Sequence, residues 1–140
     1  MLRYLPLILI GFAVGAQGQT TPVISLAMHY SNARARMIEA GFAPFRAIPA
    51  DSDLFKQNFA GREDIARKFP EAAKCEPKGK SPCYFLFARG PTEIVAITTV
   101  GAHPETLIVR KVHAATPAEA EMLYAANPLS DTDRSPQRRS

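Results

Sequence analysis

The sequence predicts an α+β fold in which one long N-terminal helix packs on a three- to four-stranded antiparallel sheet, followed by a short C-terminal helix. Three observations support this prediction. A run with helical spacing lies between residues 21 and 41, three apolar runs separated by short turns lie between 83 and 113, and a helix-start signal begins at residue 116. Short turns favour antiparallel neighbours, because a parallel pair of strands needs a longer crossover.

The N-terminal helix is predicted to begin at Thr21-Pro22 and to end before Gly41. Thr21 is a suitable N-cap, and Pro22 would take the first helical position, where its missing N–H costs nothing. Gly41 supplies the left-handed residue that ends a helix, and Phe42 is placed to pack back as in a Schellman motif. The apolar residues of the run share one helix face: Leu26, Tyr30, Ala33 and Met37.

The sheet is predicted from strands at 83–89, 93–100 and 106–113, with a further short strand at 45–48. The strand at 83–89 is apolar on both faces, so a helix should cover one face and another element should touch the other. Residues 51–74 are predicted to be irregular, with helical turns. A capping box at 116–119 predicts a helix through about Ala126, stopped at Asn127-Pro128.

Residues 1–18 have the pattern of a cleaved secretory signal peptide. Arg3 provides a positive start, Leu5–Val14 is apolar, and Ala16-Gln17-Gly18 places small residues at the cleavage site, so Gln19 would begin the mature chain. The apolar run is shorter than the ~20 residues that cross a membrane. We therefore expect a periplasmic or secreted protein with one α+β domain at 19–128, no transmembrane segment after cleavage, and a disordered polar tail at 129–140.

The two cysteines, Cys75 and Cys83, are expected to form a structural disulfide. An even cysteine count in an exported chain favours a bridge, and the intervening CEPKGKSPC loop is rich in turn-forming residues. The alternatives are a metal site and a redox pair. The C-x7-C spacing suits neither zinc nor a C-x-x-C redox motif, so we expect no metal and no cofactor.

The charge balance is mildly basic, with 17 Lys and Arg against 13 Asp and Glu. The signs are interspersed, which disfavours a nucleic acid as the partner. The densest basic stretch, residues 62–80, predicts either a solvated surface of mixed charge or a patch that meets an anionic partner. The partner envisaged is an envelope protein.

Enzyme signatures are absent from the sequence, which contains no nucleophile elbow, zinc-protease helix, phosphate-binding loop or dinucleotide-binding glycine motif. One catalytic hypothesis is a small secreted hydrolase, nuclease-like, in which His103 and His113 act as a general acid–base pair beside the cations Arg110 and Lys111. The alternative interpretation places these residues on the surface of an edge strand, where charge discourages pairing with other chains.

The aromatic strand at 83–89 offers candidate binding residues. Its side chains divide between two faces, Tyr84 and Leu86 on one and Phe85 and Phe87 on the other. The half that does not pack beneath the long helix, represented by Tyr84 and Leu86, either belongs to a second part of the core or forms an exposed surface for a partner.

The chain also resembles a group of small, uncharacterised periplasmic bacterial proteins. The residues concerned are Tyr30-x-x-Ala33-Arg34-x-x-Met37-Ile38-x-x-Gly41-Phe42-x-Pro44, Phe69-Pro70-Glu71, Cys75 and Cys83-Tyr84-Phe85. The layout is more distantly similar to β-lactamase-inhibitor-protein and PepSY-like modules, although the inhibitor proteins carry two such units. The resemblance implies a binding or inhibitory module of the cell envelope. We expect this module to be non-enzymatic and to bind through the sheet face not covered by the long helix. A purely structural envelope protein is the further alternative.

Overall fold

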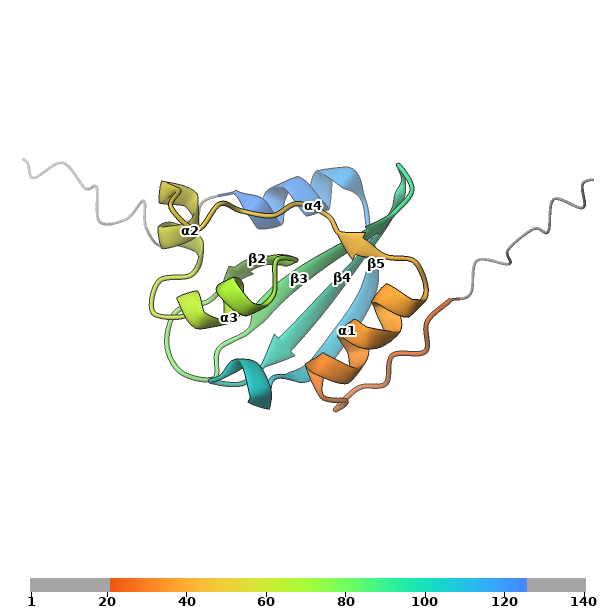
Figure 1. The fold of residues 1–140 in the computed structure, drawn as a ribbon, viewed down its shortest axis with the longest axis horizontal. Helices are drawn as coiled ribbons and strands as arrows, with labels where there is room; N and C mark the ends of the chain where they lie inside the picture. The colour runs from red at the N-terminus through yellow and green to blue at the C-terminus, as the bar shows by residue number, and fades with distance from the viewer. Residues whose placement is uncertain (1–20, 126–140) are drawn as a thin grey trace, which may run out of the picture.

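A five-stranded antiparallel sheet forms the centre of the computed structural model, which describes residues 21–125 (Figure 1). The order along the sheet is β1-β3-β4-β5, and β2 pairs with the same side of β3 as β1 does, nearer the beginning of β3. The predicted α+β class and antiparallel pairing are confirmed, but the sheet has five strands rather than the predicted three to four. The strands are β1 (Ala43–Pro44), β2 (Ala72–Cys75), β3 (Cys83–Arg89), β4 (Glu93–Val100) and β5 (Ile108–Ala115).

Helices cover both faces of this sheet. Side chains of α1 (Tyr30–Glu39) and α3 (Glu63–Lys68) pack against Phe85 and Phe87 on one face, together with α2 (Asp53–Asn58). On the opposite face, α4 (Pro117–Tyr124) packs on Leu86 and Ala96. We call these the α1 face and the α4 face. The alternation predicted for β3 is confirmed, because Phe85 and Phe87 lie on the α1 face and Leu86 on the α4 face.

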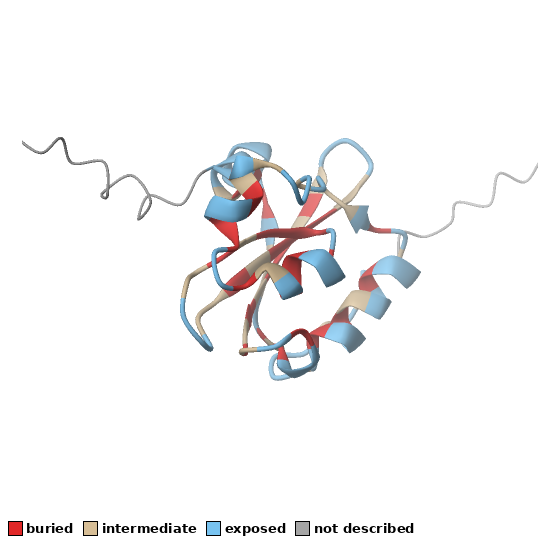
Figure 2. Ribbon diagram, turned by 60° about the vertical axis from the view of Figure 1, so that its left-hand side comes forward, coloured by how far each residue is buried: buried red, intermediate tan, exposed pale blue. Residues whose placement is uncertain are grey.

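Figure 2 shows that buried residues concentrate along the strands and on the inward sides of the helices. Beneath α1, Tyr30 stacks on Phe85 with 4.0 Å between ring centroids and meets Phe69 edge-on at 4.9 Å. Beneath α4, Tyr124 stacks on Phe45 at 5.7 Å. One aromatic cluster thus packs α1 against the sheet, and the other packs α4 against its opposite face.

The predicted start of the N-terminal helix is wrong, because α1 begins at Tyr30 rather than after Thr21. Residues 27–29 run instead beside β5, where Ala27 donates its N–H to the carbonyl of Val109 and Val109 donates to that of Met28. These backbone bonds use an N–H, that of Ala27, and a carbonyl, that of Met28, which a helix would have paired internally. Leu26, predicted on the buried face, is 66% exposed. The helix is therefore ten residues long, shorter than expected.

The predicted end of that helix is confirmed in detail. Gly41 has a φ of +90°, the Gly41 N–H bonds to the carbonyl of Ile38, and the Phe42 N–H bonds to that of Met37. This is the hydrogen-bond pattern of a Schellman motif. The remaining predicted face residues, Tyr30, Ala33 and Met37, are all fully buried.

The segment from residue 43 to 75 contains more sheet than the sequence predicts. The strand expected at 45–48 is instead the two-residue β1, which ends at Pro44. The helical turns expected within 51–74 are α2 and α3, and α3 ends just before Phe69-Pro70. The strand β2 was not predicted, because it is only four residues long. Its pairing with β3 is also interrupted by a bulge near Lys74.

The C-terminal elements follow the prediction with small shifts. The strands β3 and β4 have the predicted bounds, whereas β5 begins and ends two residues later than expected. Thr116 caps α4 by accepting the Glu119 N–H at 3.1 Å, and the helix ends at Tyr124. The predicted signal peptide at 1–18 and tail at 129–140 lie outside the described residues. Within residues 21–125, no helix is both long and apolar enough to span a membrane.

Candidate functional site

One row of residues crosses four strands on the α4 face. The register pairs Lys74 of β2 with Tyr84 of β3, Tyr84 with Thr98 of β4, and Thr98 with Lys111 of β5. Neighbouring strands lie ~4.8 Å apart, so the two lysine backbones are roughly 14 Å from each other. An amine therefore stands at each end of the row, with two hydroxyl groups between them.

This row forms the floor of a groove that α4 borders. The helix covers the half of the face that holds Leu86 and Ala96, but it does not extend over the row itself. The resulting groove has a volume of about 500 Å³. We call it the basic groove, and its lining consists of Lys74, Tyr84, Thr98, Lys111, His113, Glu119, Met122 and Leu123.

At one end of the basic groove, Lys74 supplies a positive charge and the Tyr84 ring supplies apolar surface. The Lys74 ammonium lies 5.7 Å from the centroid of the Tyr84 ring, which is within the range of a cation–π contact. Tyr84 donates its hydroxyl hydrogen to Glu76 at 2.9 Å. Burial, and then this bond to a carboxylate, raise the pKa of Tyr84, so the hydroxyl stays neutral at physiological pH.

His113 lies at the junction between the floor and α4. The register places it opposite Ala96, one row closer to the helix than Lys111. Its Nε2 is 4.0 Å from a carboxylate oxygen of Glu119, while its buried Nδ1 has no hydrogen-bond partner among the described residues. Because Nδ1 is buried, a ligand in the groove would meet the Nε2 side of the imidazole, next to Glu119.

The wall of the groove is fixed in place by the end of α4. Tyr124 donates its hydroxyl hydrogen to the carbonyl of Arg46 at 2.8 Å, and its own carbonyl accepts from Asn58 Nδ2 at 3.2 Å. Asn58 also donates to the carbonyl of Ala73 at 3.1 Å, which links the helix to β2. Arg46 completes the connection by pairing with Glu121. Met122, on the groove side of this anchored helix, is 72% exposed.

The expected disulfide between Cys75 and Cys83 is present, one register position from two residues of the groove. The two cysteines are directly opposite each other in the β2–β3 register, with their Cα atoms 4.0 Å apart. Both are buried on the α1 face. Because the next pair in the register is Lys74 and Tyr84, the covalent bond fixes the spacing of these two groove residues.

Of the two binding residues predicted on β3, only Tyr84 lines the groove. Leu86 is 0% exposed and packs in the core beneath α4. The helix covers this position because its buried residues Ala120 and Tyr124 face the sheet there. The sequence named Lys111 only as a cation beside the histidine pair and Lys74 only as part of the basic stretch at 62–80. It did not bring the two lysines into one site, because Lys74 lies on a strand that the sequence did not predict.

The structure does not bring His103 and His113 together. His103 caps η1 (Pro104–Thr106), beyond the end of β4, and η1 contacts α1 and α3 on the α1 side of the sheet. His113 is on the α4 face opposite Ala96, four residues before the end of β4. At about 3.3 Å per residue, this separates them by roughly 13 Å along the strand alone.

The basic stretch at 62–80 does not form one patch. Arg62 is only 3% exposed and binds three carbonyls, those of Glu76 and Ser81 at 3.1 Å and that of Gly101 at 2.6 Å. Lys68 pairs with Glu105 on the surface, whereas Lys74 lines the basic groove on the opposite face. The stretch therefore divides between a structural role and separate surfaces.

Within residues 21–125, no group of three or more His, Cys, Asp or Glu side chains is arranged to hold a metal ion. The side chains that line the basic groove carry two amines, two hydroxyls, one imidazole and the carboxylate of Glu119, beside an apolar rim. Comparison with known proteins found no matching family model, no matching curated protein and no matching solved structure.

Proposed function

We propose that this protein is a small exported binding or inhibitory module of the cell envelope, without enzymatic activity, and that the basic groove is its binding surface. The observation that carries the proposal is the row Lys74–Tyr84–Thr98–Lys111, which places one amine at each end of a floor that bears two hydroxyl groups. This groove is on the sheet face that α1 does not cover, where the sequence analysis expected binding.

The composition of the groove favours a ligand that is both anionic and partly apolar. Lys74 and Lys111 supply positive charge, which steers an oppositely charged partner and improves specificity. Met122 and Leu123 supply an apolar rim of the kind that is desolvated in protein interfaces. An envelope protein with an acidic surface segment combines these properties.

The disulfide supports export. Disulfides form and persist in oxidising compartments such as the bacterial periplasm, and they are rare in the cytosol. The bridge between Cys75 and Cys83 agrees with the secretory pattern of residues 1–18 and with the resemblance to small periplasmic proteins. Together these observations favour an envelope location.

The experiment that tests this proposal compares two double charge reversals. The full chain is expressed with its own N-terminal segment in a bacterial host, purified in oxidised form and immobilised to capture partners from an envelope extract. Lys74→Glu/Lys111→Glu alters the groove, whereas Arg67→Glu/Lys68→Glu alters two exposed cations on α3 by the same net charge. Thermal unfolding confirms that both variants fold.

We expect the wild-type protein and the α3 variant to retain the same partner, and the groove variant to lose it. Equal capture by both variants would place the binding surface elsewhere. Capture of no partner above background by the wild type would favour a structural envelope protein instead. Recovery of the protein from the cytosolic fraction, with Cys75 and Cys83 reduced, would contradict export.

A further inference from the structure

The outer edge of β5 is paired at its beginning and open beyond it. Ala27 donates to the carbonyl of Val109 at 2.8 Å, and Val109 donates to that of Met28 at 2.9 Å, so residues 27–29 act as a short neighbouring strand. Ala27 has a φ of +67°, and none of residues 21–26 forms a backbone hydrogen bond with β5. Within residues 21–125, no strand pairs with this edge after Val109.

The register shows which backbone groups face outward along the open edge. Leu86 exchanges bonds with Phe45 and Glu71 on the β1 and β2 side, so the Leu86–Ala96 pair is not a hydrogen-bonded one. The N–H and C=O of one residue in an antiparallel strand point to the same side, so those of Ala96 face away from Leu86 and toward His113. The backbone N–H and C=O groups of Val112 and Ala114 therefore point away from the sheet, toward solvent.

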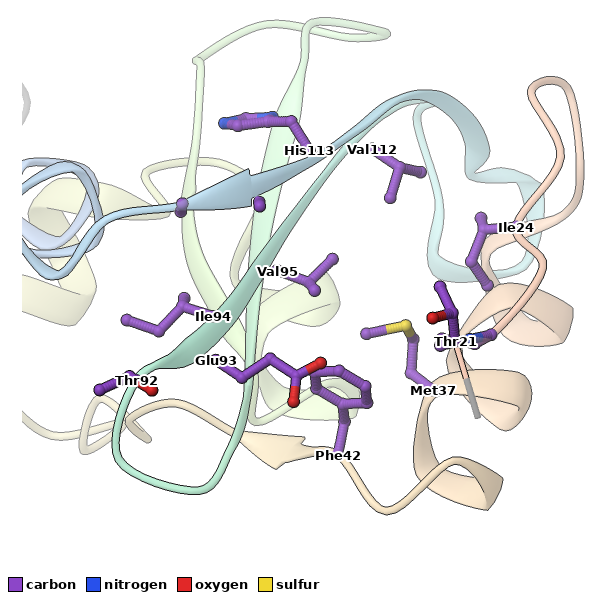
Figure 3. Close-up of a pocket in the computed structure, with 13 residues that line it drawn as sticks. Thr21, Ile24, Met37, Phe42, Thr92, Glu93, Ile94, Val95, Val112 and His113 are labelled. Carbon is purple, nitrogen blue, oxygen red and sulfur yellow. The ribbon is translucent and has the colours of Figure 1, made fainter. Parts of the chain in front are cut away.

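An apolar hollow lies on the α1 face beside this edge. Figure 3 shows Val95 and Val112 of the sheet facing Met37, Phe42 and Ile24 across it. The hollow has a volume of about 410 Å³, and its wall on β5 is formed by Val112 and Ala114 together with their neighbours. Side chains that stand beside Val112 and Ala114 on an added strand would lie against this hollow.

The opposite side of the edge is basic. Lys111 and His113 belong to the basic groove on the α4 face, and Arg110 and Lys111 are exposed. Neither Arg110 nor Lys111 forms an ion pair with another residue of the described chain. Pairing with a second copy of β5 would gather Arg110 and Lys111 of both copies along one short edge, and like charges on adjacent strands are unfavourable. An acidic partner would be attracted.

We propose that an extended acidic segment of the partner protein binds by adding a strand to the open edge of β5. Main-chain bonds to Val112 and Ala114 would supply affinity, as in other complexes in which a peptide extends a sheet. Alternate side chains would be apolar, against the hollow, and acidic, beside Lys111 and His113. This inference rests on the proposed function, because it specifies how the partner of the basic groove is recognised.

The test uses a capped seven-residue peptide of alternating glutamate and valine, titrated into the oxidised full chain and followed by NMR. We expect saturable binding, slowed amide exchange at Val112 and Ala114, and no binding of the peptide in which lysine replaces glutamate. Ala114→Pro removes one outward N–H, and an edge strand tolerates proline where its N–H faces solvent. Ala114→Ser keeps the N–H and serves as the matched control.

Ala114→Pro is expected to weaken peptide binding about tenfold, which corresponds to ~1.4 kcal/mol, whereas Ala114→Ser changes it less than about twofold. Unchanged binding to Ala114→Pro would overturn strand addition, even if the groove variant still lost its envelope partner. Failure of the peptide to bind the wild type would also overturn strand addition. The proposed function is tested separately, by the capture from envelope extract. If the oxidised protein forms dimers that Ala114→Pro dissociates, the edge pairs with a second copy of the chain, which would also overturn the proposal.

Discussion

Lys74 of β2 and Tyr84 of β3 lie directly opposite each other, one position from the disulfide that joins Cys75 to Cys83. The ammonium of Lys74 rests beside the Tyr84 ring, and the Tyr84 hydroxyl donates to Glu76 in the loop that the disulfide closes. The short strand β2 would otherwise be held only by its pairing with β3 and its contacts with the helices. The bridge thus ties the geometry of the basic groove to the oxidation state of the chain.

Removing the disulfide should destabilise the protein and loosen the groove. The chain-entropy model gives roughly 2.5 kcal/mol for a loop of this length, so Cys75→Ala/Cys83→Ala should lose about that much free energy of unfolding. Urea denaturation of the oxidised protein and the variant measures the difference. A loss below about 0.5 kcal/mol would contradict a stabilising role for the bridge.

Arg62 should be irreplaceable by lysine. Its guanidinium binds two carbonyls near the two ends of the disulfide loop and a third at Gly101. The single ammonium of a lysine lacks the planar fork of donors that reaches all three. Hydrogen bonds to charged groups contribute ~1.5–3 kcal/mol, so Arg62→Lys should reduce the free energy of unfolding by about 2–3 kcal/mol. The exposed Arg67→Lys is the control and should change it by less than ~0.5 kcal/mol. Equal effects of the two substitutions would refute this role.

Gly101 and Gly61 should differ sharply in their tolerance of alanine. Both have positive φ, +146° and +74°, but a Cβ on Gly101 would lie 2.7 Å from the carbonyl oxygen of Thr106, whereas one on Gly61 would meet nothing within 4 Å. Gly61→Ala should cost only the ~1–2 kcal/mol of the left-handed backbone. Gly101→Ala adds a clash with backbone and should cost more than about 3 kcal/mol. Thermal and urea unfolding measure which substitution costs more stability. A Gly61→Ala variant less stable than Gly101→Ala would contradict this prediction.

Stability should fall above about pH 10, because three tyrosines resist ionisation in the folded state. Burial is the largest cause in each case, raising the pKa of Tyr30 well above its ordinary value, that of Tyr84 less, and that of Tyr124 to about 12. Tyr30 also donates to the buried Glu71 carboxylate at 2.6 Å, and the nearby negative charge opposes its ionisation.

The unfolded state loses these protons first as the pH rises, so each group contributes stability below its unfolded pKa that is lost above it. A single tyrosine contributes up to ~1.4 kcal/mol per pH unit to this slope. Urea unfolding between about pH 8 and pH 11 should show a shallower decline for Tyr30→Phe than for Tyr84→Phe. Identical slopes for the wild type and Tyr30→Phe would show that Tyr30 ionises normally.

The sequence predicted the elements whose signals are local. The Schellman end at Gly41–Phe42, the N-cap at Thr116 and the alternating strand at 83–89 each depend on neighbouring residues, and all three are confirmed. The predicted start of α1 was wrong because the N-cap signal at Thr21-Pro22 is local, whereas residues 27–29 pair with β5, which is distant in sequence.

The candidate site could be predicted only in part, for the same reason. Tyr84 was found because it lies on a recognisable strand, and the disulfide because the cysteine spacing is visible. The row that joins Lys74 to Lys111 exists only through the register of four strands, and β2 gave no sequence signal of its own. The burial of Leu86 likewise depends on where α4 packs.

The most direct test of the basic groove as the binding surface is the NMR signal of the Met122 methyl group in methionine-labelled, oxidised protein. Met122 is 72% exposed on the groove rim. On addition of the captured envelope partner, the Met122 signal should shift or broaden. Lys74→Glu/Lys111→Glu should abolish this change, whereas Arg67→Glu/Lys68→Glu, the control with the same change in net charge, should retain it. An unperturbed Met122 signal in the presence of bound partner would contradict the account.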